Sequence, residues 1–246
     1  MKEDIHTQFQ INDIREQMFY DCVRERTADE KKKEKAYINA FWKFSKSGWL
    51  PYLVDLEKMS RGTIILLAEK PTDSVREYIY QKYCENNFRA CKRLKKRLDG
   101  YFQGGNDYYR SFNVLYRKKE FLGCCMMLFA LIEQRIRQHY CTNTQPENLV
   151  PRALDDIFND INFKFGIYSM HPSRVLCQKS LVNLLRNYFE NAKNFINEPE
   201  YMNRNFLMHG MAKREYSHID CIQLMCILDY FCHFEMEAKK ANEEKL

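Results

Sequence analysis

The sequence predicts an all-α protein, and three observations support this prediction. Turn-forming residues are scarce, because the 246 residues include only 8 Gly and 6 Pro, and this favours a few long helices over many short strands. Apolar residues recur at helical spacing along most of the chain. Residues 121–132 are apolar except at Gly123, which is typical of a helix buried in a core.

The N-terminal part, residues 1–72, is expected to form a helical extension. Residues 1–45 are interpreted as one or two helices, and the mixed charges of residues 29–35 indicate a solvated helix face. Ser47-Gly48 interrupts this pattern, and a new apolar segment begins at Trp49. Within that segment, residues 63–67 are compatible with a short strand.

The remaining part, residues 73–246, is expected to form a helical-bundle domain. Pro71 marks the break before it, and Gly100 with the Gly104-Gly105 pair is expected to end the first helix. The predicted helices cover, in order, residues 74–98, 107–117, 118–140, 151–162, 173–194 and 217–242.

The composition limits where the protein is expected to act. The net charge of +6 favours anionic partners without identifying one. No apolar run approaches the roughly 18 to 20 residues needed to span a bilayer, and the polar N-terminus lacks the apolar core of a signal peptide. The 10 Cys form no C-x-x-C pair, which argues against zinc-ribbon and thioredoxin-like sites and favours a reducing compartment. We therefore expect a cytoplasmic protein without a membrane partner.

One stretch of the predicted helix 74–98 is strongly basic and is a candidate for contacts with RNA phosphates. Its cationic residues are Lys92, Arg93, Lys95, Lys96 and Arg97. A solvated helix face is the more frequent explanation of such a run, so the stretch does not decide the function.

The polar segment 203–210 lies between the last two predicted long helices and carries the candidate chemistry. Arg204 and His209 are five positions apart, so on a helix their side chains are rotated by about 500° and point some 140° apart. The two groups therefore converge on one phosphate only if the segment begins outside the helix or if a second copy of the chain supplies a partner. A surface arginine and a capping histidine are the alternative reading.

The chemistry that this pair could perform is RNA cleavage by the ribose 2′-hydroxyl. Histidine has an ordinary pKa of about 6.5, so His209 could act as acid and base. The Arg204 guanidinium could stabilise the charge that develops on the phosphoryl oxygens. Asn205 is expected to orient one of these side chains, although an ordinary turn residue is the alternative. No metal or other cofactor is required, because the substrate carries its own nucleophile.

The segment Asn203-Arg204-Asn205-x3-His209-Gly210, followed by Tyr216 and an apolar helix ending in Ile227-Leu228-Asp229-Tyr230, resembles the signature end of HEPN-domain proteins. Further resemblances to one bacterial branch extend over about residues 45–235. They are Gly48-Trp49-Leu50-Pro51, Tyr109-Arg110-Ser111-Phe112 through Leu131-Ile132-Glu133, and Pro172-Ser173-Arg174.

The resemblance implies a HEPN-like helical bundle of four or five core helices and a homodimer in which two Arg/His pairs face each other. It also implies roles in phage defence, toxin systems or RNA processing, with an antitoxin or regulatory partner in some cases. Glu133 would stand at the acidic position of the family, although Gln134 replaces the small residue that often follows it. From the residues alone, Glu133 either pairs with Arg137 one helical turn away or is buried and reaches Arg204.

The sequence therefore predicts a metal-independent endoribonuclease that acts on RNA through Arg204, His209, Asn205 and Glu133. The rival reading is a non-catalytic HEPN-like module that binds RNA or a protein. A third possibility is a purely structural helical protein, in which His209 would be buried or isolated.

Overall fold

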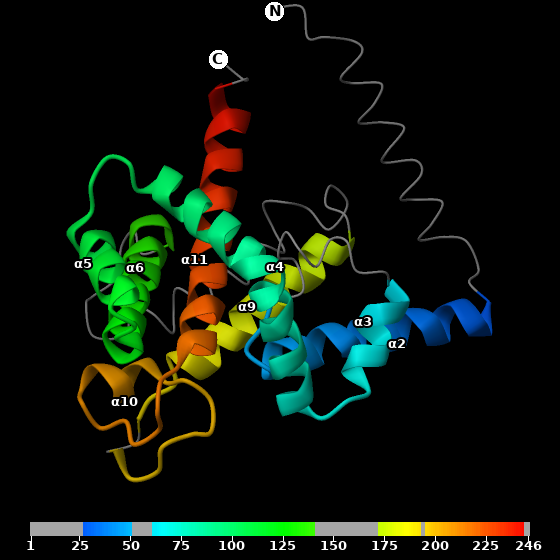
Figure 1. The fold of residues 1–246 in the computed structure, drawn as a ribbon. Helices are drawn as coiled ribbons and strands as arrows, with labels where there is room; N and C mark the ends of the chain where they lie inside the picture. Colours follow the sequence, from blue (N-terminus) through cyan, green and yellow to red (C-terminus); the bar gives the residue numbers. More distant parts are fainter. Residues whose placement is uncertain (1–26, 51–60, 141–171, 193–194, 244–246) are drawn as a thin grey trace, which may run out of the picture.

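The computed structural model describes residues 27–50, 61–140, 172–192 and 195–243. Within these ranges the protein consists of helices without any strand, so the predicted all-α class is confirmed (Figure 1). The helices are α2 (Ala28–Lys46), α3 (Arg61–Ala68), α4 (Thr72–Tyr101), α5 (Asp107–Arg117), α6 (Phe121–Tyr140), α9 (Pro172–Tyr188), α10 (Arg204–Met208) and α11 (His218–Glu243).

Helix α11 forms the centre of the core. Every residue from 219 to 229 is buried, and the helix packs against α6 on one side and α4 on the other (Figure 1). Helix α6 also packs against α5, with Leu128, Phe129 and Leu131 fully buried. Of the helices described, none is both long and apolar enough to cross a bilayer.

Helix α2 and the turn after it belong to the same core. Helix α2 packs against α3, α9 and α4, and the Trp49 ring stacks on Tyr83 of α4 with 5.5 Å between ring centroids. Gly48 has a φ of +82°, and a Cβ there would lie 2.5 Å from the Gln223 amide, which donates to the Ser47 carbonyl at 2.9 Å. The packing therefore crosses residue 72, where the helical extension was expected to end.

Helix α4 departs from the single regular helix that was predicted over 74–98. It begins at Thr72 and continues through Gly100 to Tyr101, so Gly100 does not end it. The backbone leaves the helical conformation at Glu85, and Asn86, Asn87 and Phe88 all have positive φ. The interruption divides α4 into two helical arms.

The prediction of a short strand over 63–67 is wrong, because these residues lie in α3. A short apolar run does not distinguish a strand from a buried helix, and packing against α2 decides in favour of the helix. The predictions for 107–117 and 217–242 agree closely with α5 and α11, whereas α9 ends at Tyr188 rather than at residue 194. The predicted helix 151–162 and the segment before residue 27 lie outside the described residues.

Candidate functional site

Helix α10 is short, and side chains on neighbouring residues stabilise its first turn. Asn203 is the N-cap, and its Oδ1 accepts hydrogen bonds from the backbone N–H groups of Asn205 and Phe206 at 2.9 and 3.2 Å. Such a cap satisfies donors that the first turn leaves without helical partners. The Asn203 amide in turn donates to the Glu190 carbonyl at 3.1 Å, so the start of α10 is attached to the chain that follows α9.

The other end of α10 closes at His209 and Gly210. Gly210 has a φ of +69°, and the N–H of Met211 donates back to the Phe206 carbonyl at 2.8 Å. A left-handed glycine directly after a helix is a common way to satisfy the last carbonyl groups. The motif Asn-Arg-Asn-x3-His-Gly is therefore also the sequence of a short helix with a cap at each end.

Glu133 of α6 lies at the centre of the polar contacts made by Arg204. Its Oε2 accepts from Nε and Nη2 of Arg204 at 3.1 and 2.8 Å. Its Oε1 accepts from Nε and Nη2 of Arg137 at 2.9 and 2.6 Å. Both contacts proposed for Glu133 from the sequence therefore occur together. We call Glu133, Arg204, Arg137 and Asn205 the Glu133 cluster.

Asn205 contributes a third contact to the Arg204 side chain. Its Oδ1 accepts from Nη1 of Arg204 at 3.1 Å, and its own amide donates to the Glu190 carbonyl at 3.0 Å. A guanidinium has five N–H groups, so these three bonds leave one on Nη1 and one on Nη2. The Arg204 side chain remains 25% exposed, so part of it is accessible to a ligand.

His209 is the C-cap of α10. The residue is exposed, and its ring meets the edge of Phe195 with 5.2 Å between centroids. Among the residues that the structure describes, none forms a hydrogen bond with this imidazole. Arg204 begins α10 and His209 directly follows it, so the segment between them is helical and the two side chains diverge within one chain.

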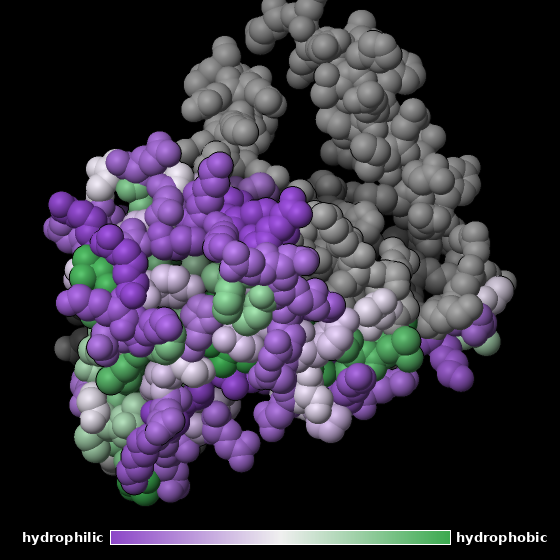
Figure 2. Space-filling model, in the orientation of Figure 1, coloured by the Kyte–Doolittle hydropathy of each residue, from purple (hydrophilic) through white to green (hydrophobic). Residues whose placement is uncertain are grey.

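The cationic residues of the predicted RNA-binding stretch of α4 fall into two groups. Nε and Nη2 of Arg97 donate to the buried Asp229 carboxylate at 2.9–3.1 Å, and Lys95 is paired with Asp99 and the Tyr109 hydroxyl. Lys92, Arg93 and Lys96 are exposed. Figure 2 shows a densely hydrophilic surface where α4 faces the viewer. Two of the five cations therefore join elements of the fold.

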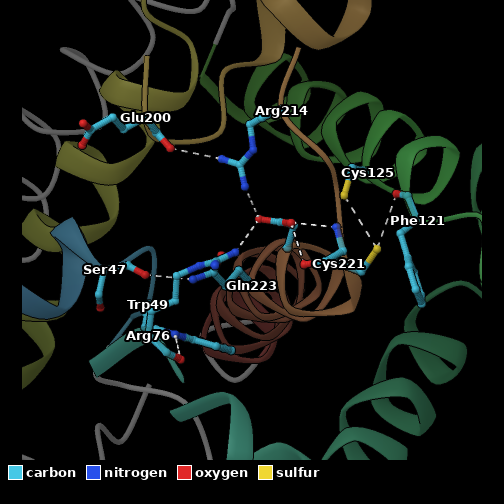
Figure 3. A network of polar contacts seen from close by, with 11 residues as sticks. Ser47, Trp49, Arg76, Phe121, Cys125, Glu200, Arg214, Cys221 and Gln223 are labelled. Carbon is cyan, nitrogen blue, oxygen red and sulfur yellow. Dashed lines mark hydrogen bonds and ion pairs between the residues drawn. The ribbon is translucent and has the colours of Figure 1, made fainter. Parts of the chain in front are cut away.

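A second carboxylate held by two arginines was not singled out from the sequence. Oδ1 of Asp220 accepts from Arg76 at 2.7 Å and from Arg214 at 2.8 Å, and its Oδ2 accepts from the N–H and hydroxyl of Ser217 (Figure 3). The Asp220 side chain is 1% exposed. A carboxylate in the first turn of an otherwise apolar helix was the available signal. We call these four residues the Asp220 cluster.

Hydrogen bonds also join the two ends of the loop that carries α10. One carboxylate oxygen of Glu198 accepts from the backbone N–H groups of Lys213 and Arg214 at 2.6 and 3.2 Å. Arg214 then connects this closure to Asp220 on α11. The position of α10 is thus determined by α6 through Glu133 and by α11 through Arg214.

His218, the first residue of α11, is held between two tyrosines. Its Nδ1 lies 3.1 Å from the Tyr80 hydroxyl and its Nε2 lies 2.6 Å from the Tyr116 hydroxyl. Burial lowers the pKa of the His218 imidazole, and the Lys119 ammonium lowers it further. Burial and the nearby ammonium therefore favour the neutral form of the His218 imidazole.

In the described ranges, no three or more His, Cys, Asp or Glu side chains are grouped so that they could hold a metal ion. None of the family models, curated proteins or solved structures compared with the chain matches it.

Proposed function

We propose that the protein is a metal-independent endoribonuclease with Arg204 and His209 in its active site. The observation that carries the proposal is a guanidinium, held by a carboxylate and an amide, on the same short helix that ends at an exposed histidine. Glu133 and Asn205 take three N–H groups of Arg204, whose side chain remains 25% exposed, while His209 is exposed at the end of the same short helix. A bidentate arginine edge suits a phosphoryl group.

The reaction follows from the groups present. A neutral His209 removes the proton from a ribose 2′-hydroxyl, and the 2′-oxygen attacks the adjacent phosphorus. The bond from phosphorus to the 5′-oxygen breaks, and a protonated imidazole donates a proton to that leaving oxygen. The products are a 2′,3′-cyclic phosphate and a 5′-hydroxyl. Arg204 stabilises the negative charge on the phosphoryl oxygens in the transition state.

The reaction uses one imidazole as base and one as acid, and each chain supplies one His209. Arg204 and His209 also diverge within one chain, which favours a site assembled from two copies. We therefore propose a homodimer in which the two α10 helices face a common RNA strand. A cytoplasmic role in phage defence, a toxin system or RNA processing, with an antitoxin or regulatory partner, belongs to the same proposal.

The test is cleavage of a panel of single-stranded and structured RNAs in the presence of EDTA. Wild type and the control His233→Ala, which replaces an exposed histidine on α11, should cut at similar rates. His209→Ala should lose at least about 100-fold in rate, as expected when an acid–base group is removed. If wild type leaves every RNA intact, or if His209→Ala cuts as fast as wild type, the nuclease proposal is refuted.

The alternative is a non-catalytic module that binds RNA or a protein. The number of imidazoles favours this alternative, because a chain that supplies one His209 would lack a complete acid–base pair as a monomer. It predicts RNA binding that His209→Ala leaves unchanged and no cleavage under any condition. Sedimentation measurements on the same samples would separate a dimer from a monomer.

A further inference from the structure

The Glu133 cluster contains an arginine that the proposed reaction does not use. Arg137 follows Glu133 by one turn of α6 and binds Oε1, whereas Arg204 binds Oε2. One carboxylate thus holds two guanidinium groups, and the three charges leave an excess of one positive charge. The Arg137 side chain is 40% exposed, compared with 25% for Arg204 and 13% for Glu133.

The two arginines contact Glu133 through the same pair of nitrogens. Each uses Nε and Nη2 for Glu133, and this orientation leaves Nη1 of Arg137 outside the ion pair. Two guanidinium groups held at one carboxylate are preorganised, because Glu133 screens their mutual repulsion before a ligand arrives. An exposed pair within one helix contributes only a few tenths of a kcal/mol, so helix stability alone gives little reason for the arrangement.

We propose that Arg137 is a second phosphate-binding residue of the site, with Arg204 holding the scissile phosphate and Arg137 the adjoining phosphate of the same strand. The inference rests on the proposed function for its ligand, an RNA backbone. Contacts of this type position a strand without reading its bases. The cluster therefore selects a continuous phosphodiester chain rather than a particular sequence.

The test uses a 2′-O-methyl RNA oligonucleotide, which binds but cannot be cleaved because its 2′-oxygens are blocked. Affinity is measured by fluorescence anisotropy over a range of salt concentrations. For single strands, each phosphate contact contributes about 0.7 to the slope of log affinity against log salt. Arg137→Gln and Arg204→Gln should each reduce the magnitude of this slope by about 0.7 for every copy that holds the strand.

A matched control and a double variant separate direct binding from indirect positioning. Arg110→Gln removes the same charge from an exposed arginine of α5 that pairs with Asp107, and its slope should equal that of wild type. If Arg137 binds its own phosphate, the double variant Arg137→Gln/Arg204→Gln should lose a further contact relative to Arg204→Gln. If Arg137 only positions Arg204 through Glu133, the double variant and Arg204→Gln should have the same slope.

Three results would overturn the inference: no binding of the oligonucleotide by wild type, an unchanged slope in Arg137→Gln, or no further loss in the double variant. The nuclease proposal is judged separately by cleavage in EDTA. If cleavage depends on His209 but the salt slope is the same in wild type and Arg137→Gln, only the proposed phosphate contact of Arg137 is refuted. If the salt slopes are as predicted but no RNA is cleaved, the nuclease proposal is refuted and the phosphate-binding surface stands.

Discussion

The Asp220 and Glu133 clusters contain the same types of charged group but differ in burial. In each, one carboxylate accepts from two arginines. Asp220 is 1% exposed, and its arginines come from α4 and from the loop before α11. Glu133 is 13% exposed, and one of its arginines lies on the same helix. A buried carboxylate that joins several elements stabilises the fold, whereas a cluster whose carboxylate lies nearer the surface is accessible to a ligand.

The largest expected effect is on the Asp220 cluster. Asp220→Asn should lower the free energy of unfolding by about 3 kcal/mol, because it leaves two arginines around a buried neutral group. The value is at the low end for a broken buried ion pair, since both arginines keep some contact with water. Urea denaturation measures it, with Asp73→Asn, an exposed carboxylate of α4, as the control. A loss as small as that of the control would contradict the structural role.

In the Glu133 cluster, we expect a small effect on stability and a large effect on the proposed activity. Glu133→Gln should change the free energy of unfolding by less than about 1 kcal/mol, as partly exposed ion pairs do. It should lower the proposed RNA cleavage rate by about 100-fold, because Arg204 loses the group that orients it toward the phosphate. Parallel urea melts and cleavage assays test both parts, with Glu120→Gln, an exposed carboxylate directly before α6, as the control. Destabilisation equal to that of Asp220→Asn would erase the distinction between the clusters.

The smallest expected effect is a dependence of stability on pH, located beside the Asp220 cluster. Burial lowers the pKa of His218 in the folded state, so the unfolded chain binds a proton first as the pH falls. The stabilising contribution is therefore complete above the unfolded value of about 6.5 and is lost as the pH falls below it toward the lowered folded value. Melts between pH 5 and 8 should show this loss in wild type and in His233→Gln, and His218→Gln should lack it. Identical profiles for all three would exclude His218 as the source.

Much of the fold could be predicted because local signals agree with the packing. The Gly104-Gly105 pair separates α4 from α5, whose predicted range 107–117 agrees with the structure, and the apolar spacing of 217–242 reproduces α11. Residues 63–67 were misjudged because their β-branched residues favour a strand locally, whereas the helix is determined by packing. The interruption of α4 did have a signal, since asparagine adopts positive φ more readily than most residues.

The site was predictable only in part. The motif around Arg204 and His209 is local, and its two caps can be understood from adjacent residues. The contact of Arg204 with Glu133 joins positions 71 residues apart, and Arg76 meets Asp220 across 144 residues. Such pairings depend on how the helices cross, which spacing along one chain does not contain. The same sequence pattern therefore fits a paired surface arginine and a member of an active site.

The left-handed turn within α4 has a geometric consequence. Arg76 on the first arm pairs with Asp220, and Arg97 on the second arm pairs with Asp229, both on α11. A straight helix would separate the α-carbons of the two arginines by about 31 Å, whereas those of the two aspartates are about 13 Å apart along α11. The bend at Glu85–Phe88 shortens the distance between the two arginines, so α4 can form ion pairs with α11 at two places. If residues 85–88 were helical instead, α4 would be straight and the two ion pairs could not form at the same time. The first arm would then lie farther from the end of α11 that supports the α10 loop.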